Sequence, residues 1–243
     1  MTAKKDAGRG QTSLNSYSGG EAISRAKGTA ADGATSASPA IASARDFDRH
    51  LRTFRHQRDG AITDTVRSTR VEEVNAGDRV VRRYIGEFWT AKQRNATSLH
   101  EVSYRACFKP QLPRFFIDRL TAEGDRVYDP FGGRGTTIIE ATLAGRRGIS
   151  NDVNPLSEIF ASPRLHIPGL SDIERRLREI PLDRTKTADI DLCMFYHAET
   201  LGEIVSLREY LQERRATGKE DEIDRWIRMV ATTRLTGHSP GFF

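Results

Sequence analysis

Residues 126–137 read RVYDPFGGRGTT and carry the strongest indication of a fold in this sequence. The first three residues match a short strand, and the glycine-rich loop behind Asp129 leads into an apolar helical pattern over residues 138–144. Gly145 suits the left-handed position that ends many helices, and residues 148–151 predict a second strand that ends at Asp152. This order predicts the first βαβ unit of a nucleotide-binding α/β fold.

The loop and its two acids indicate the kind of ligand. No glycine stands three residues beyond Gly135, so the dinucleotide-binding fingerprint fails at its third position. Asp129, at the end of the first strand, would repel a pyrophosphate and attract an ammonium or a sulfonium. Asp152 stands where an acid can accept hydrogen bonds from both ribose hydroxyls. S-adenosylmethionine satisfies both acids; alternatively, Asp129 only turns the chain and Asp152 only caps a helix.

A family resemblance rests on these residues. The stretch 129–137, DPFGGRGTT, resembles the DPFxGxGTT motif of the amino-group DNA methyltransferases, which methylate the exocyclic amine of adenine (N6) or cytosine (N4). Residues 104–113 are similar to the family segment before this loop, and residues 151–156 resemble its second strand. The resemblance covers about residues 100–162. It implies a Rossmann-like class I methyltransferase fold of the α/β class, with a partial sheet and helical N- and C-terminal additions.

The resemblance also implies a site and its partners. S-adenosylmethionine would be held by ten residues: Phe108, Pro110, Asp129, Pro130, Phe131, Gly132, Gly133, Gly135, Thr136 and Asp152. For Phe108, a packing role is an equal alternative. No metal is needed for this methyl transfer, and the six histidines form no ligand pair. DNA is the implied substrate, and a companion restriction enzyme is a candidate partner.

The catalytic residues stay unassigned. The family carries a [DNS]-P-P-[YFW] segment that holds the target amine and stacks on the flipped base, but this chain contains no Pro-Pro dipeptide. Its nearest approach, residues 239–242 (SPGF), has glycine in place of the second proline, and we reject it. We therefore expect an N-terminal fragment, or truncated product, of a site-specific DNA methyltransferase. The alternatives are an RNA methyltransferase of the guanine-N2 type and a non-catalytic S-adenosylmethionine-binding remnant.

Four regions follow from the composition along the chain. Residues 1–45, rich in Ala, Gly, Ser and Thr, predict a disordered tail. Residues 46–99 predict a helical N-terminal region, with Val80, Val81, Tyr84, Ile85 and Phe88 at helical spacing. Residues 100–165 form the predicted cofactor-binding core. Residues 166–243 predict a helical insert or target-recognition region, with a capping box at 171–174.

A basic ridge lies in the second of these regions. Four arginines recur every three residues: Arg49, Arg52, Arg55 and Arg58. Such a ridge could follow a nucleic-acid backbone, or it could be a solvated helix face.

The overall composition excludes several classes of protein. The 243 residues carry a formal net charge of +5, which permits a polyanionic partner without requiring one. No apolar run approaches the roughly 18 residues of a membrane span, and the polar N-terminus lacks the apolar core of a signal peptide. Two cysteines cannot form a disulfide framework or a Cys-based zinc site. These features predict a cytoplasmic protein with reduced thiols.

Overall fold

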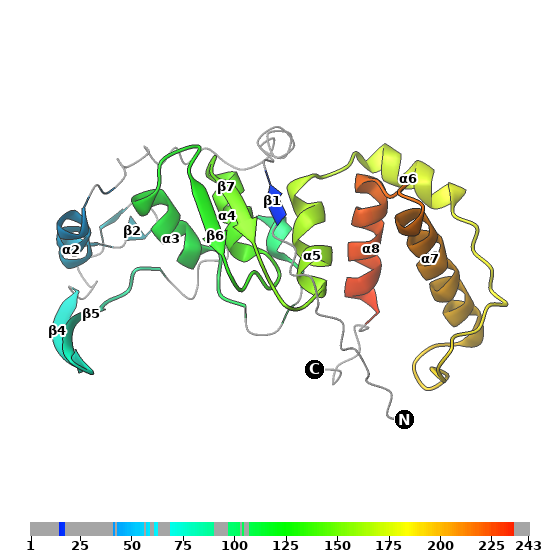
Figure 1. The fold of residues 1–243 in the computed structure, drawn as a ribbon, viewed down its shortest axis with the longest axis horizontal. Coiled ribbons are helices and arrows are strands. Elements are labelled where there is room, and N and C mark those ends of the chain that lie inside the picture. Colours follow the sequence, from blue (N-terminus) through cyan, green and yellow to red (C-terminus); the bar gives the residue numbers. More distant parts are fainter. Residues whose placement is uncertain are drawn as a thin grey trace, which may run out of the picture.

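The computed structural model describes residues 15–17, 41, 43–55, 57–58, 61–62, 69–89, 97–102, 104 and 107–235, with the backbone alone for 15–17, 57–58 and 61–62. Figure 1 shows these elements spread along one long axis, with a β-hairpin at one end, a small sheet in the middle and a group of helices at the other end. The predicted disordered tail, residues 1–45, lies mostly outside the described residues. The described parts combine helices with small sheets, as an α/β chain should.

The predicted βαβ unit is present. Strand β6 (Arg126–Asp129) leads through the glycine loop into helix α4 (Thr136–Leu143), and strand β7 (Arg147–Ser150) returns parallel to β6. The register sets Asp129 opposite Ser150. A short strand, β1 (Asn15–Tyr17), pairs antiparallel with the other edge of β7 and gives the strand order β1-β7-β6. This strand was not predicted, because the local composition of a Ser- and Gly-rich segment carries no strand signal.

Burial of one face of α4 holds this unit together. Ile138 and Ile139 of α4 are fully buried against Ala161 of helix α5 (Leu156–Ala161) and Leu165 of the 3-10 turn η3 (Ser162–Leu165). Leu99, in the 3-10 turn η2 (Ser98–His100), completes this core. Removing such aliphatic surface from water contributes about 25 cal/mol per Å², so α4 and the strands beside it form one packed body.

Helix α3 (Gln111–Leu120) covers the same body and contacts α4. Pro113 lies in the first turn of this helix, where a proline costs little because the first amides have no partner inside the helix. Helix α2 (Ala44–Thr53) joins it through an aromatic cluster. In this cluster the Phe54 and Phe115 rings meet edge to face at 5.3 Å, and the Arg119 guanidinium lies 3.9 Å from the Phe115 ring centre.

The prediction of a helical region over residues 46–99 is wrong beyond α2. Strands β2 (Gln57–Arg58) and β3 (Ala61–Ile62) form one small antiparallel pair. Strands β4 (Arg70–Ala76) and β5 (Arg79–Ile85) form a longer hairpin that projects from one end of the molecule (Figure 1). Its β-branched residues favour strands, and Gly77, with φ of 65°, adopts the left-handed conformation that this tight turn needs. The spacing of the apolar residues fitted a helix by coincidence.

The far end of the molecule is helical. Helices α6 (Leu170–Glu179), α7 (Ala198–Ala216) and α8 (Glu222–Arg234) lie together there (Figure 1). The capping box predicted at residues 171–174 is wrong, because α6 begins earlier and Gly169 stands at its N-cap without a side-chain cap. A true capping box, between Asp221 and Asp224, begins α8 instead.

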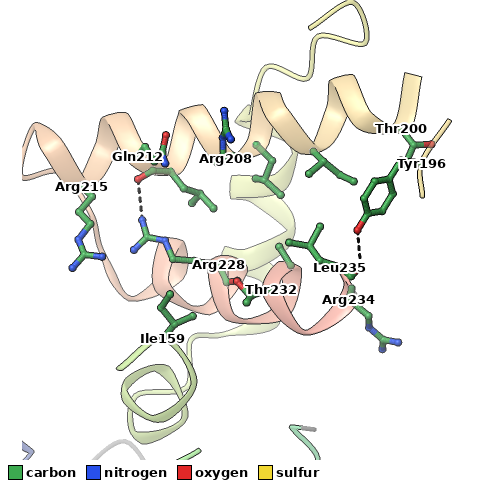
Figure 2. Close-up of a pocket in the computed structure, with 14 residues that line it drawn as sticks. Ile159, Tyr196, Thr200, Arg208, Gln212, Arg215, Arg228, Thr232, Arg234 and Leu235 are labelled. Carbon is green, nitrogen blue, oxygen red and sulfur yellow. Dashed lines mark hydrogen bonds between the residues drawn. The ribbon is translucent and has the colours of Figure 1, made fainter. Parts of the chain in front are cut away.

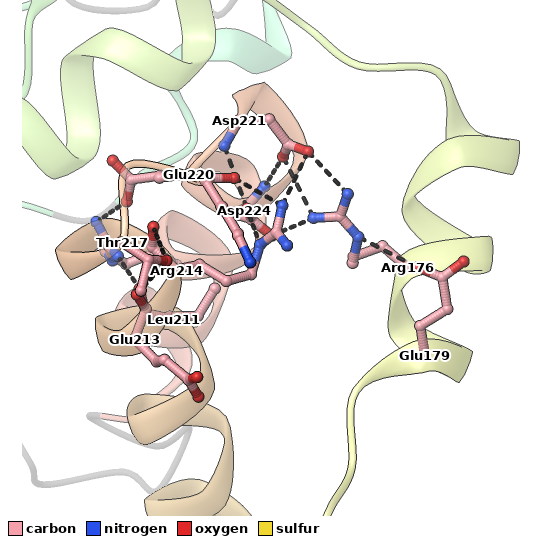
Figure 3. Close-up of polar contacts among 11 residues, drawn as sticks. Arg176, Glu179, Leu211, Glu213, Arg214, Thr217, Glu220, Asp221 and Asp224 are labelled. Carbon is pink, nitrogen blue, oxygen red and sulfur yellow. Dashed lines mark hydrogen bonds and ion pairs between the residues drawn. The ribbon is translucent and has the colours of Figure 1, made fainter.

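An ionic network connects these helices, as Figure 3 shows. Asp224 is fully buried; it accepts a hydrogen bond from Arg214 Nε at 2.5 Å and another from Arg176. Arg176 Nη2 also donates to Asp221 Oδ2 at 2.7 Å. A buried carboxylate is costly unless it is paired, so Arg176 holds α6 against the start of α8.

Two further expectations concern the whole chain. Among the residues that the structure describes, no helix combines the length and apolar character that crossing a membrane requires. Cys107 and Cys193 are both exposed and unpaired.

Candidate functional site

The parallel strands bring the two predicted acids to one edge of the sheet. Asp129 is the last residue of β6, and Asp152 stands two residues past the end of β7. The Asn151 amide donates to the Asp129 carbonyl at 3.0 Å, so the sheet pairing continues up to Asp152. Ligands of parallel α/β sheets bind outside the carboxyl ends of their strands, which is where both acids lie.

Both carboxylates also shape the glycine loop. Asp152 Oδ2 accepts a hydrogen bond from the Gly133 amide at 2.7 Å, and its Oδ1 accepts one from the Asn154 amide at 2.8 Å. Asp129 Oδ1 accepts one from the Phe131 amide at 3.0 Å. A carboxylate has about four acceptor positions, so these contacts leave capacity for a ligand. The contact with Phe131 is the one that the alternative interpretation, in which Asp129 turns the chain, predicts.

Two of the loop glycines are required by packing. A Cβ added at Gly132 would overlap the Ser150 hydroxyl oxygen, and one added at Gly135 would lie 2.7 Å from Ala161 Cβ. Gly135 also has a φ of 84°, in the left-handed region. The small size of these glycines therefore lets the loop pack onto β7 and α5.

The other predicted cofactor residues have contrasting surroundings. Phe131 is 84% exposed beside the loop, and Pro130 is also exposed. Thr136 is buried at the start of α4, and Pro110 is buried just before α3. Phe108 is 41% exposed. Packing thus accounts for Pro110 and Thr136, whereas the exposed rings of Phe108 and Phe131 have apolar surface available to a ligand.

Sequence reasoning missed one aromatic neighbour of the loop. The Tyr104 ring lies 3.5 Å from the position of a Cβ at Gly133, and its hydroxyl accepts a hydrogen bond from Asn154 Nδ2 at 3.3 Å. Tyr104 stands in the segment that resembles the family, which was the only signal that could have found it. Tyr104 therefore connects that segment to the glycine loop and to the turn that follows β7.

Two arginines behind the loop were also missed. Arg134 belongs to the loop itself, and Arg164 belongs to η3. Burial, reinforced by the nearby charge of Arg134, lowers the pKa of the Arg164 guanidinium to about 10. Arg164 still carries its charge at neutral pH.

The four arginines of the predicted ridge do not share one helix, because α2 ends at Thr53, before Arg55, and Arg58 belongs to β2. The two that lie in α2 form local ion pairs. Arg49 Nη1 lies 3.2 Å from Asp46 Oδ1, and Arg52 Nε lies 3.0 Å from Asp48 Oδ2. Both pairs are exposed and within one helix, so they contribute little stability. This arrangement favours the solvated helix face over a tract for a nucleic-acid backbone. The side chain of Arg58 lies outside the described residues.

A cavity lies elsewhere, between α7 and α8 (Figure 2). It has a volume of about 580 Å³ and walls that are mainly apolar, with Ile159 of α5 at one side. Tyr196 donates a hydrogen bond to the Leu235 carbonyl at 2.5 Å, and Arg228 donates to the Leu211 carbonyl at 3.0 Å. None of the predicted cofactor residues lines this cavity.

Metal chemistry has no candidate centre in this part of the chain. Within the described residues, no group of three or more His, Cys, Asp or Glu side chains could hold a metal ion. The rejected segment 239–242 lies outside the described residues.

Comparisons with known proteins agree with the motif. The model of the DNA methylase family, which comprises N6 and N4 methyltransferases, matches residues 54–158. The type II methyltransferase M.MjaII of Methanocaldococcus jannaschii is 31% identical over 83 residues, which cover 34% of this chain and 16% of the relative. M.MvaI of Kocuria varians is 29% identical over 109 residues, covering 41% and 24%. M.BsoBI of Geobacillus stearothermophilus is 32% identical over 87 residues, covering 34% and 17%.

The extent of these matches is limited. The chain spans between 16% and 24% of the length of these curated relatives. No solved structure is significantly similar to it. The matched region nevertheless contains the glycine loop, both acids and Tyr104, so the similarity of residues 54–158 to the DNA methylase family includes the whole candidate site.

Proposed function

We propose that this chain binds S-adenosylmethionine at the carboxyl ends of β6 and β7, as the cofactor-binding part of a DNA amino-methyltransferase. The target would be the exocyclic amine of adenine or cytosine. The sheet would be the beginning of a Rossmann-like class I methyltransferase fold. The proposal rests on one observation above all: Asp129 and Asp152 lie at adjacent strand ends and flank a glycine loop that opens a helix.

The charges and shape of this edge fit the cofactor. Two carboxylates create a negative site, which suits a ligand that carries a sulfonium and an ammonium and has no phosphate. Asp152 would accept hydrogen bonds from the ribose hydroxyls. Asp129 would attract the cationic methionine part, and Phe108 and Phe131 would offer apolar surface beside it. The first amides of α4 face the loop and would donate to a carboxylate.

Methyl transfer requires the protein mainly to position the cofactor and the target amine. When bound, the cofactor supplies an activated methyl group that an amine can attack in line. The chain must then fix that end of the ligand and exclude competing nucleophiles, since the amine has to approach within about 3–3.5 Å. The hydrogen bonds of Asp152 and Asp129 to loop amides keep the loop in one shape before the ligand arrives. Such preorganisation lowers the entropic cost of binding.

DNA is the proposed substrate, on the strength of the family match and the printed names of the relatives. A companion restriction enzyme remains a candidate partner for the same reason. The net charge of +5 is compatible with a polyanion.

Calorimetric titration with S-adenosylmethionine tests the cofactor proposal. The wild-type protein is compared with Asp129→Asn, which removes the charge and keeps the shape. Asp189→Asn is the matched control, because its side chain is 91% exposed on the loop before α7. We expect Asp129→Asn to bind at least about tenfold more weakly, the effect of losing roughly 1.4 kcal/mol of charge attraction. The control should bind as the wild type does.

Two outcomes would contradict the proposal. Absence of binding by the wild-type protein would contradict the proposed cofactor site. Binding by Asp129→Asn as tight as that of the wild type would contradict the role of the Asp129 carboxylate. The substrate is tested by transfer of labelled methyl to duplex DNA, catalysed by the protein that contains this chain. Label that appears in RNA and not in DNA would favour the guanine-N2 alternative.

A further inference from the structure

Two arginines bind the backbone behind the glycine loop. Arg164 is only 2% exposed, and its guanidinium donates to three carbonyls. Nε binds the Phe160 carbonyl at 2.6 Å, Nη1 binds the Leu99 carbonyl at 2.5 Å, and Nη2 binds the carbonyl of Arg134. Arg164 therefore connects α5, η2 and the glycine loop at one point.

The side chain of Arg134 continues this arrangement. Its Nη1 donates to the His100 carbonyl at 2.9 Å and to the Val102 carbonyl at 3.0 Å, while its Nε donates to Thr136 Oγ1 at 3.1 Å. Arg134 thus connects the loop to the segment 99–102. Together the two guanidinium groups occupy three of the four carbonyls of that segment.

Stability by itself does not explain the burial of Arg164. Within the described residues, no ion pair joins Arg164 to a carboxylate, and burial lowers the pKa of its guanidinium. A buried cation that contacts only neutral carbonyls loses hydration energy without a compensating opposite charge. Apolar side chains could fill the same space at lower cost, which indicates that the geometry of the segment matters.

The segment has a clear neighbour. Residues 99–102 lead directly to Tyr104, whose ring lies against Gly133, and then to Phe108 and Pro110. His100 Nε2 also meets Glu140 Oε1 of α4 at 2.7 Å, so the segment is held from the helix as well. Its position relative to the loop therefore decides where Tyr104 stands.

We propose that Arg134 and Arg164 are positioning residues, which hold residues 99–102, and with them Tyr104, against the glycine loop and thereby set the affinity for S-adenosylmethionine. Neither side chain needs to touch the cofactor. This inference rests on the proposed function, because it concerns the same site. It adds residues that act from behind the loop.

Titration of three variants with S-adenosylmethionine tests it. Arg134→Ala removes all three side-chain hydrogen bonds and should weaken binding by about tenfold or more. Arg134→Lys can still donate to both carbonyls and should recover most of the affinity. Arg126→Ala is the matched control, since Arg126 is an exposed arginine at the other end of β6; it should bind as the wild type does. Each titration is made at a temperature where circular dichroism shows the variant fully folded.

The outcomes separate this inference from the proposed function. Binding by the wild type and equal binding by folded Arg134→Ala would overturn the inference and leave the proposed function intact, whereas no binding by the wild type would overturn the proposed function. Failure of Arg134→Lys to recover affinity would contradict a role for the two carbonyl contacts. If Arg134→Ala does not fold, hydrogen exchange of the wild type decides: the cofactor must slow exchange in residues 99–102 together with residues 132–136. Slowing confined to the loop would overturn the inference.

Discussion

Substitution of Gly132 by alanine should destabilise the site through a single contact. Gly132 has no left-handed φ in the structure, so its backbone can accept an alanine without strain. The added Cβ would overlap the Ser150 hydroxyl oxygen, and it would lie 3.3 Å from Ser150 Cβ and 3.4 Å from Ser157 Oγ. All three residues are buried. We therefore expect Gly132→Ala to lower the free energy of unfolding by about 1–3 kcal/mol, the usual cost of overpacking a core.

The same geometry predicts a rescue. Ser150→Ala removes the overlapping oxygen, and the closest remaining distance to the new Cβ is then 3.3 Å, which a shift of a few tenths of an ångström relieves. By itself Ser150→Ala should change the free energy of unfolding by less than about 1 kcal/mol. The double variant should be more stable than Gly132→Ala, with a coupling energy of about 1–2 kcal/mol.

Urea denaturation of the four proteins, followed by circular dichroism, measures this cycle. The titration with S-adenosylmethionine can be repeated on the double variant, which should regain binding along with stability. A neutral Gly132→Ala would mean that the serine turns away at no cost. A destabilised Gly132→Ala that Ser150→Ala does not rescue would mean that the contact is not the cause. Either result would refute the packing explanation for this glycine.

Three further predictions concern other parts of the molecule. Arg176→Ala should lower the free energy of unfolding by about 1–3 kcal/mol in urea denaturation, because buried Asp224 keeps only Arg214 as its cationic partner; no change would exclude the network as a link between α6 and α8. Burial alone would raise the pKa of Asp221, but its hydrogen bond with Arg176 and the charges of Arg176 and Arg214 lower it from 3.8 to about 2. The stability that this carboxylate contributes is therefore complete above pH 3.8 and is lost as the pH falls toward 2, and denaturation across this range should show a smaller loss in Arg176→Ala than in the wild type. Gly77→Ala should cost about 1 kcal/mol through its left-handed φ although nothing crowds the site, whereas Gly77→Asn should cost less; equal melting temperatures would contradict this.

Much of the site followed from short-range sequence features. The strand before Asp129, the glycine loop and the helix behind it form a local unit, so their order along the chain was enough to predict a βαβ arrangement. Because parallel strands end at the same edge, the sequence also predicted that Asp129 and Asp152 would lie near each other. Their hydrogen bonds to the loop amides agree with this placement.

The prediction failed where one pattern fits two structures. Val80, Val81, Tyr84 and Ile85 match a helix face, but their β-branched and aromatic side chains also favour a strand, and in the structure they belong to β5. The deciding signal was Gly77 with Asp78, a two-residue turn between β-branched runs, which was overlooked. The capping box predicted at residues 171–174 is absent because α6 already begins at Leu170, with Gly169 as its N-cap. A short sequence motif does not determine the first residue of a helix when tertiary packing favours another boundary.

The βαβ unit, its two acids and the resemblance to the amino-group DNA methyltransferases could be predicted from the amino-acid sequence, because they depend on residues close together in the chain. The hydrogen bonds that join the glycine loop to residues 99–102 could be found only in the folded protein. Arg164 donates a hydrogen bond to the carbonyl of Leu99, which is 65 residues away in the sequence. Arg134 donates one to the carbonyl of His100, which is 34 residues away. No periodicity in the sequence relates these arginines to their partners, since the guanidinium groups reach the carbonyls only when α4 and α5 are packed together. The need for glycine at Gly132 has the same origin, because the Ser150 side chain that excludes a Cβ comes from the neighbouring strand.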